Sequence, residues 1–173
     1  MSNFPLSARR ISRLSVVGRV LLGAAVALLF APPTRVALAQ PRGDDLKFDV
    51  ETLSIRATRS NDEVSPKLRD LAEKLRQEFR FTGYRVEKDS NCKVDEAGEN
   101  CKHDLGSKYE IRVQYQGVNE QGKVKLEIVV LHRDDKKLSS TVAITPGKTA
   151  LFGGWDLPGG DKLIVAITPT RRD

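Results

Sequence analysis

Two alternating stretches decide the fold: YEIRVQYQ at residues 109–116 and VKLEIVV at residues 124–130. In both, apolar side chains stand at every second position, with polar side chains between them except at Val129. This period of two is typical of a β-strand that has one buried face and one solvated face. The polar segment 119–122, which contains a glycine, separates the two stretches. The pair therefore predicts an antiparallel β-hairpin.

More strands are expected after this hairpin. The sequence indicates a polar turn at residues 133–137, a strand at 138–145 and a short strand at 148–152. A glycine-rich turn at 153–161 and a last strand at 162–168 follow. Together with the hairpin, these segments predict a meander of about five strands.

A strand–helix–strand unit precedes the meander. Ser65-Pro66 is a typical helix start, because serine accepts hydrogen bonds from first-turn amides and proline at the first helical position loses none. Apolar residues then recur at steps of three and four, which gives the helix one apolar stripe. The stripe consists of Leu68, Leu71, Ala72, Leu75 and Phe79. We expect the helix to end near Arg80 and a strand to run from Tyr84 to Lys88.

The first predicted strand carries two alternating apolar sets, residues 46, 48 and 50 and residues 53, 55 and 57, which are out of phase by one. A single regular strand would turn one set to solvent. We therefore expect a bulge or a break near Glu51-Thr52. The sequence as a whole predicts an α+β fold in one domain, residues 46–173. In this fold a single helix packs on a mostly antiparallel sheet of about six to seven strands.

The first 39 residues have the three parts of a secretory signal peptide. Arginines at positions 9, 10, 13 and 19 precede an apolar run at residues 20–31, and Ala37-Leu38-Ala39 forms a small-x-small ending. The apolar run is shorter than the roughly 20 residues that a membrane span needs. We expect cleavage after Ala39, a flexible segment at residues 40–45, and a periplasmic or extracellular protein without a permanent membrane anchor. An uncleaved signal anchor is the alternative.

The arginines of this leader bear on charge and on the export route. Five of the 29 basic residues and none of the 23 acidic ones precede residue 40, so the net charge of +6 falls to 24 basic against 23 acidic residues, or +1, after cleavage. Binding to nucleic acid, which needs a concentrated basic surface, is therefore not expected. Arg9-Arg10 leaves the twin-arginine route as an alternative to ordinary export, although Ser12 stands where that pattern has an apolar residue.

Cys92 and Cys101 are the only cysteines, and both lie in the polar stretch 89–108, which reads as a loop between strands. In an oxidising compartment they are expected to form a disulfide, which would stabilise the fold by about 2.7 kcal/mol. A metal site of both cysteines with His103 is the alternative, but the spacing is not that of a zinc knuckle and a fourth ligand is not evident. The acidic residues of the stretch do not have the spacing of a calcium loop. We therefore expect no bound metal.

No group of residues predicts catalysis. His103 and His132 are the only histidines, and neither has an evident partner or cleft of the kind that a general base needs. The serines lack a G-x-S-x-G motif. Asp134-Asp135 lies in a lysine-rich turn, where solvation explains it. We expect no catalytic residue and no cofactor.

The binding residues that we expect lie in segment 153–160. Gly153-Gly154 and Gly159-Gly160 flank Trp155, the only tryptophan. No helix follows, so the glycines are interpreted as turn residues rather than as a phosphate-binding loop. Trp155 either caps the end of the sheet or serves as an exposed anchor for a partner, since aromatic residues are favoured in that role.

Residues 145–169 resemble two signatures of the secretin family of outer-membrane secretion and pilus channels. One signature is a glycine-x-threonine strand that ends in Gly-Gly, and the other is a later apolar strand that ends in Thr-Pro. The matching positions are Gly147, Thr149, Gly153, Gly154, Thr168 and Pro169. The long strands that the family carries between these signatures are replaced by residues 155–160. The resemblance therefore implies a shortened relative of the family or an envelope protein that reuses this strand pair, associated with secretion or pilus machinery, rather than a pore.

The sequence thus predicts an exported, non-catalytic domain that binds a protein or a surface polymer. An open antiparallel sheet offers an edge strand or a face to such a partner. Two alternatives remain open. One is an exported hydrolase whose site is assembled from scattered residues, and the other is a carrier that holds a small ligand on the concave face of the sheet.

Overall fold

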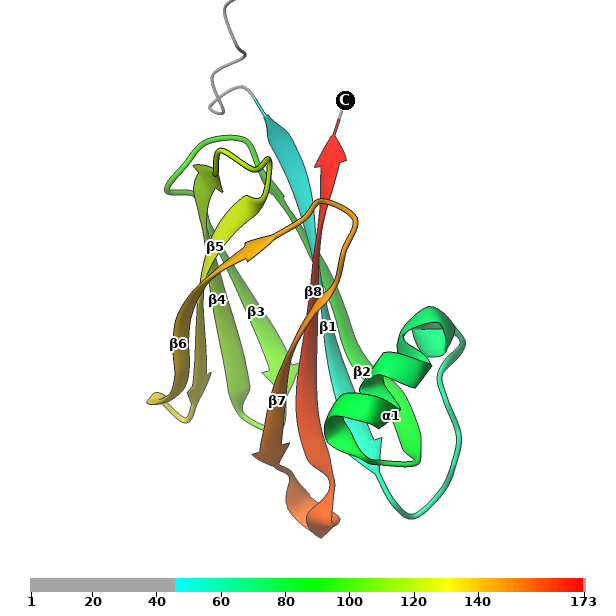
Figure 1. Ribbon diagram of the computed structural model, residues 1–173. Helices are drawn as coiled ribbons and strands as arrows, with labels where there is room; N and C mark the ends of the chain where they lie inside the picture. Colours follow the sequence, from blue (N-terminus) through cyan, green and yellow to red (C-terminus); the bar gives the residue numbers. More distant parts are fainter. Residues whose placement is uncertain (1–45, 173) are drawn as a thin grey trace, which may run out of the picture. The chain divides into compact units, whose positions relative to one another are not determined.

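The computed structural model describes residues 46–172, which form two four-stranded antiparallel sheets (Figure 1). Sheet A has the strand order β2-β1-β8-β7, and sheet B has the order β3-β4-β5-β6. The strands are β1 (Lys47–Thr58), β2 (Gly83–Val94), β3 (Asn100–Gly106), β4 (Tyr109–Val118), β5 (Val124–His132), β6 (Asp135–Ile144), β7 (Ala150–Asp156) and β8 (Lys162–Arg172). The helices are the 3₁₀-helix η2 (Pro66–Leu71), α1 (Ala72–Phe79) and the short 3₁₀-helix η3 (Pro158–Gly160). The predicted signal peptide and the segment 40–45 lie outside the described residues.

The predicted α+β fold is wrong, because the strands form two sheets packed as a β-sandwich rather than one sheet under a helix. The difference arises in the stretch expected to be a loop, where β2 continues to Val94 and β3 begins at Asn100. The predicted hairpin of β4 and β5 is confirmed. Because β3 pairs with β4, this hairpin belongs to a second, separate sheet. The predicted strand from Tyr84 to Lys88 is confirmed as the first half of β2. The second half of β2 and all of β3 escape detection because each lies at the edge of its sheet, where most side chains are polar.

β1 is one continuous strand, so the expected bulge or break near Glu51-Thr52 is wrong. Its register with β8 is unbroken from Lys47 to Ala57. The two apolar sets point to opposite faces of the strand, and both faces are buried. Residues 48 and 50 belong to the core between the sheets, whereas residues 53, 55 and 57 belong to a second core under the helix. The one irregularity of β1 is on its β2 side, where the register shifts between Ser54 and Ile55.

β8 has the same two-faced burial. Its residues 163–167 are each at most 1% exposed. Leu163, Val165 and Ile167 enter the core between the sheets, and Ile164 and Ala166 enter the core under the helix. The two central strands of sheet A are therefore buried on both sides, which explains why the run LIVAI shows no alternation.

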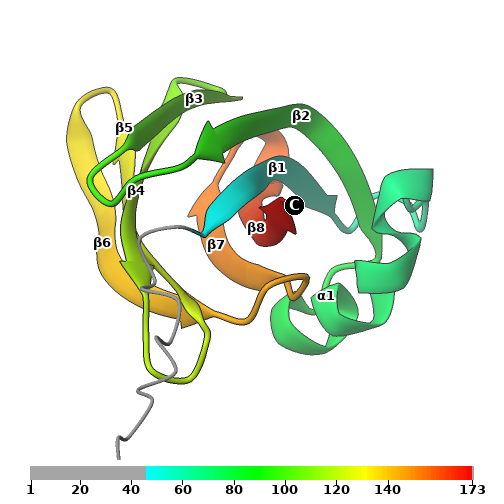
Figure 2. The same ribbon diagram turned by 90° about the horizontal axis from the view of Figure 1, so that it is seen from above.

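The helix covers the outer face of sheet A, on the side away from sheet B (Figure 2). Leu68 and Leu75 are fully buried against this face. The predicted start at Pro66 and end near Arg80 are confirmed, although the first six residues adopt the tighter 3₁₀ form. Ser65 does not cap the helix with its side chain; its Oγ accepts a hydrogen bond from the backbone N of Val86 (3.1 Å).

The sheets are joined along the edges formed by β2 and β3, where Lys88 of β2 forms an ion pair with Asp104 of β3 (3.7 Å). The disulfide Cys92–Cys101 links β2 of sheet A to β3 of sheet B. Ser54 Oγ, from the buried interior of β1, donates a hydrogen bond to the carbonyl oxygen of Leu105 (2.6 Å). At the other side of the sandwich, the chain passes from β6 to β7 through the turn at residues 145–149. We call the region where the edges of β2 and β3 meet the β2/β3 seam.

Candidate functional site

A polar cleft of about 700 Å³ opens at the end of sheet A where β1 ends and β2 begins. The segment that leads from β1 to the helix forms one wall, and the residue before β8 contributes to another. The polar side chains that matter most for its chemistry are Arg56, Arg85, Asp161, Thr58, Ser60 and Asn61. Charged groups, hydroxyls and an amide thus line one concave surface. We refer to it as the Arg56 cleft.

Arg56 is held in place by two carboxylates that are far from it in sequence. Its Nε donates a hydrogen bond to Glu87 Oε1 (2.8 Å), and its Nη1 donates one to Asp161 Oδ2 (3.1 Å). Arg85 Nη2 donates to the same oxygen of Glu87 (2.7 Å). The side chain of Arg56 is 23% exposed and that of Arg85 is 70% exposed. The first arginine is therefore a fixed part of the wall, while the guanidinium of the second is exposed enough to meet a ligand.

These contacts keep both carboxylates ionised. Burial raises the pKa of Glu87, but hydrogen bonds from Arg85 and Arg56 outweigh it and hold the pKa below its usual value. The pKa of Asp161 is lowered mainly by a hydrogen bond from Thr58 and further by Arg56. The pKa of Arg56 is raised, chiefly by its hydrogen bond to Glu87. Carboxylates with a lowered pKa are poor proton donors at neutral pH, so the arrangement is suited to holding polar groups in place.

The register of sheet A places the Arg56 cleft and Trp155 in one row. Arg85 of β2 pairs with Arg56 of β1, Arg56 pairs with Leu163 of β8, and Leu163 pairs with Trp155 of β7. Residues that pair directly across neighbouring strands point to the same face of the sheet. This face is the one toward sheet B, because Leu163 and Trp155 both pack in the core between the sheets.

Trp155 is partly buried and packs at the end of the sandwich. Its ring lies 6.2 Å from that of Tyr109 in sheet B, and Tyr109 in turn stacks on His132 at 4.3 Å. The hydroxyl of Tyr109 donates a hydrogen bond to the carbonyl oxygen of Asp156 (3.2 Å). Trp155 therefore caps the end of the sheet, as one of the two interpretations expects, and keeps part of its surface accessible. Its role as an anchor stays a prediction.

The two glycine pairs have different structural roles. Gly153 and Gly154 form a β-bulge within β7 rather than a turn, since the register with β8 shifts between Gly153 and Trp155. Gly153 has φ of 144°, and a Cβ there would come within 2.5 Å of the carbonyl oxygen of Leu163. Gly159 and Gly160 lie in the turn before β8, as expected. The structure thus extends β7 to Asp156, beyond the predicted end at residue 152.

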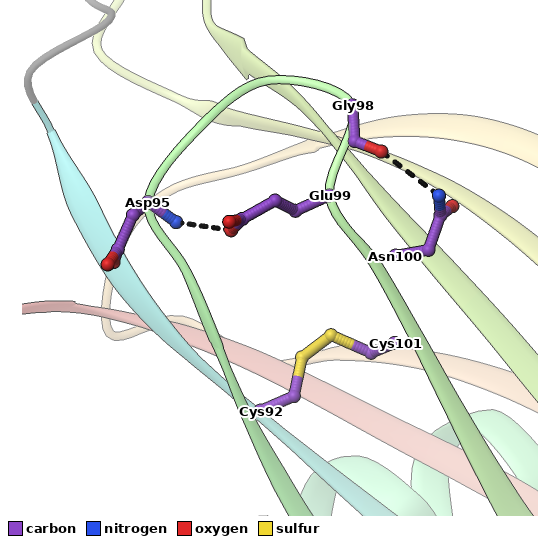
Figure 3. The surroundings of a disulfide bond; sticks show 6 residues. All are labelled: Cys92, Asp95, Gly98, Glu99, Asn100 and Cys101. Atoms are coloured by element: carbon purple, nitrogen blue, oxygen red, sulfur yellow. Dashed lines mark hydrogen bonds between the residues drawn. A yellow bond between two sulfur atoms is a disulfide. The ribbon is translucent and has the colours of Figure 1, made fainter.

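The predicted disulfide between Cys92 and Cys101 is confirmed (Figure 3). The two Cα atoms are 6.2 Å apart, a normal spacing for a disulfide. Above it, the turn between β2 and β3 is closed by Asp95 N, which donates to Glu99 Oε2 (2.6 Å), and by Asn100 Nδ2, which donates to the carbonyl oxygen of Gly98 (3.0 Å). Glu99 therefore stabilises the turn between β2 and β3.

The sequence did not point to the Arg56 cleft. Glu87 and Asp161 lie 31 and 105 residues from Arg56, so only the tertiary fold brings them together. One signal was present: an arginine stands between Ile55 and Ala57, in a strand whose neighbouring residues are apolar. A charged residue at such a position needs a partner, because burying an unpaired charge is costly.

Comparisons of the chain with known protein families, with curated proteins and with solved structures give no match. The resemblance of residues 145–169 to secretins therefore stays a prediction; in the structure these residues span β7 and most of β8, which pair antiparallel. None of the helices within residues 46–172 has the length and hydrophobicity that a membrane crossing requires.

Proposed function

We propose that this protein acts outside the cytoplasm as a non-catalytic binding domain and that it binds a surface polymer at the Arg56 cleft. The observation that carries the proposal is the cleft of about 700 Å³ in which Arg56 is fixed between two ionised carboxylates. A fixed polar wall costs little conformational entropy when a ligand binds, which favours affinity. The disulfide is consistent with export.

The lining of the cleft favours a hydroxyl-rich polymer over a protein segment. Guanidinium, carboxylate, amide and hydroxyl groups, as supplied by Arg85, Asp161, Asn61 and Ser60, donate to and accept from sugar hydroxyls. An extended peptide, by contrast, usually needs a sheet edge for its backbone or apolar pockets for its side chains. The partly exposed Trp155, in the same row as Arg56, offers an aromatic surface on which a sugar ring can pack.

Binding to polysaccharide purified from the envelope of the source cells tests this proposal. We expect Arg85→Ala and Asn61→Ala each to raise the Kd at least tenfold, because each removes a charged or polar contact from the cleft. Both side chains are exposed, so Tm should hardly change. Trp155→Phe should weaken binding less than Arg85→Ala. Lys136→Ala, on the exposed start of β6, is the matched control.

Three outcomes would contradict the proposal. If Arg85→Ala binds with the wild-type Kd, as the control Lys136→Ala should, the cleft is not the binding site. If the protein captures an envelope protein through the cleft and no polysaccharide, the partner class is wrong, and the link to secretion or pilus machinery implied by the secretin resemblance gains weight. If the polymer is cleaved, the hydrolase alternative replaces a binding role.

A further inference from the structure

The β2/β3 seam brings a third metal-binding side chain to the disulfide. The Sγ atoms of Cys92 and Cys101 and a ring nitrogen of His103 lie within 4.8 Å of one another. Cys101 and His103 are two residues apart on β3, so both side chains point to the same side of that strand. Cys92 reaches them from β2 in the other sheet. The cluster therefore draws its donors from both sheets.

His103 has an unused hydrogen-bonding atom at this place. Its Nε2 is buried and has no hydrogen-bond partner among the described residues. An imidazole nitrogen in this position is a common metal ligand. A buried polar atom without a partner normally costs stability, and a bound metal ion would remove that cost.

We propose that reduction of the Cys92–Cys101 disulfide converts the seam into a binding site for a thiophilic d¹⁰ metal ion, Zn²⁺ or Cu⁺, with Cys92, Cys101 and His103 as ligands. A dithiol reductant supplies the two electrons and two protons: the S–S bond breaks, two cysteine thiols form, and the reductant becomes a cyclic disulfide. Metal binding then displaces the two thiol protons, because the thiolate is the ligand.

The positions of the three donors fit such an ion. Zinc–sulfur and zinc–nitrogen bonds of about 2.3 and 2.05 Å in tetrahedral geometry place two sulfur atoms about 3.8 Å apart and a sulfur and a nitrogen about 3.5 Å apart. The cluster, with all three atoms within 4.8 Å, reaches these separations with small shifts of edge strands. Two thiolates and one imidazole also suit Cu⁺, since soft sulfur ligands select that ion. Either ion would restore the cross-link between the sheets that reduction removes.

Metal titration of the reduced protein tests the site. The purified protein is reduced with a dithiol, freed of reductant without air, and titrated with Zn²⁺ alone or Cu⁺ alone against a chelating indicator. We expect one ion per chain and, at a free ion concentration of 100 times the Kd, a rise in Tm on the order of 10 °C. The oxidised protein should bind neither ion at this stoichiometry. The Zn²⁺ and Cu⁺ arms show which ion is held more tightly.

His103→Gln and His132→Gln form a matched pair, since these are the only two histidines of the chain. In the reduced state, His103→Gln should lose at least tenfold in metal affinity while His132→Gln keeps the wild-type value. In the oxidised state, the Tm and circular dichroism of His103→Gln establish that the variant folds. If reduced wild type and reduced His103→Gln bind with equal affinity, or if the reduced wild type binds no ion, the proposed site does not exist. Cys92→Ser, which leaves one thiol, should also abolish binding.

Discussion

The two faces of sheet A are covered in different ways. On one face, sheet B contributes four strands to a core of 18 buried residues; on the other, η2 and α1 contribute to a core of eight. Both cores use the same two central strands, with alternate residues of β1 and β8 turned to each side. One strand can therefore serve two cores, and in β1 the second apolar set begins where the helical segment covers the outer face.

The difference in size between the two cores has a consequence for stability. The larger core joins the two sheets, whereas the smaller one fastens a helical segment of 14 residues to an already paired sheet. Polar contacts also attach the helical segment: Lys67 Nζ contacts Glu51 Oε1 (2.6 Å) and Asp89 Oδ2 (2.5 Å), Lys74 Nζ donates to the carbonyl oxygen of Thr149 (2.9 Å), and the hydroxyl of Tyr84 donates to the carbonyl oxygen of Leu75 (2.9 Å). We therefore expect the helical segment to open locally before the sandwich unfolds.

Removing a large side chain from each core is the strongest test of whether the two cores differ in stability. Ile128→Ala in β5 should lower the free energy of unfolding by about 4 kcal/mol, and Leu75→Ala in α1 by about 3 kcal/mol, because both side chains are fully buried. Urea unfolding measures both values. Hydrogen exchange should separate them, since Leu75→Ala speeds exchange in residues 66–80 while leaving β4 and β5 protected. Equal acceleration throughout the described residues would mean that the two cores unfold as one unit.

The bulge of β7, at the edge of sheet A, allows two neighbouring glycines to be compared. Gly153→Ala should destabilise the protein by about 2 kcal/mol more than Gly154→Ala. Both glycines have positive φ, but a Cβ at Gly153 would meet the backbone of β8 at Leu163 and Ile164, whereas one at Gly154 meets nothing within 4 Å. Thermal unfolding of the two variants measures the difference. Equal losses would show that the positive φ alone, and not the contact with β8, sets the cost.

Two buried hydroxyls on the sandwich face of β1 offer a finer test. Ser54→Ala should cost about 1 kcal/mol, because it removes the hydrogen bond to the carbonyl oxygen of Leu105 across the seam. Thr52→Val should change the free energy of unfolding by less than about 0.5 kcal/mol, since Thr52 Oγ1 is buried without a hydrogen-bond partner among the described residues. Chemical unfolding measures both. A larger loss for Thr52→Val than for Ser54→Ala would contradict this assignment.

The smallest expected effect is a pH dependence at the Arg56 cleft, where the sandwich face of β1 ends. The pKa of Asp161 is lowered in the folded protein, so its contribution to stability is present above the unfolded pKa and is lost as the pH falls through the folded value. Asp161→Asn should cost about 0.5 kcal/mol at pH 7 and less at pH 2. Urea unfolding at both pH values measures this.

Local patterns predicted the elements whose surroundings are simple. The hairpin of β4 and β5 has one buried and one solvated face, and the helix has a single apolar stripe, so each is readable from its own period. β1 and β8 are buried on both faces, and β2 and β3 lie at edges with mostly polar side chains. These four strands therefore lack the simple alternation of apolar and polar residues from which the buried face of a strand can be predicted.

The candidate site was less predictable than the fold. Trp155 and the glycines beside it were recognised from their residue types, and the structure places them at a bulge and at the end of the sandwich. The Arg56 cleft depends instead on the pairing of β1 with β2 and β8, which brings Arg56, Glu87 and Asp161 together. Spacing in sequence carries no information about such a group.

The antiparallel pairing of β1 with β8 joins residues 47–57 to residues 162–172, the most distant segments of the described chain. Because β8 separates β1 from β7, sheet A has no centre until β8 has been synthesised, and neither core can close before then. A ribosome-bound chain that ends at β7 is therefore unable to reach its native state.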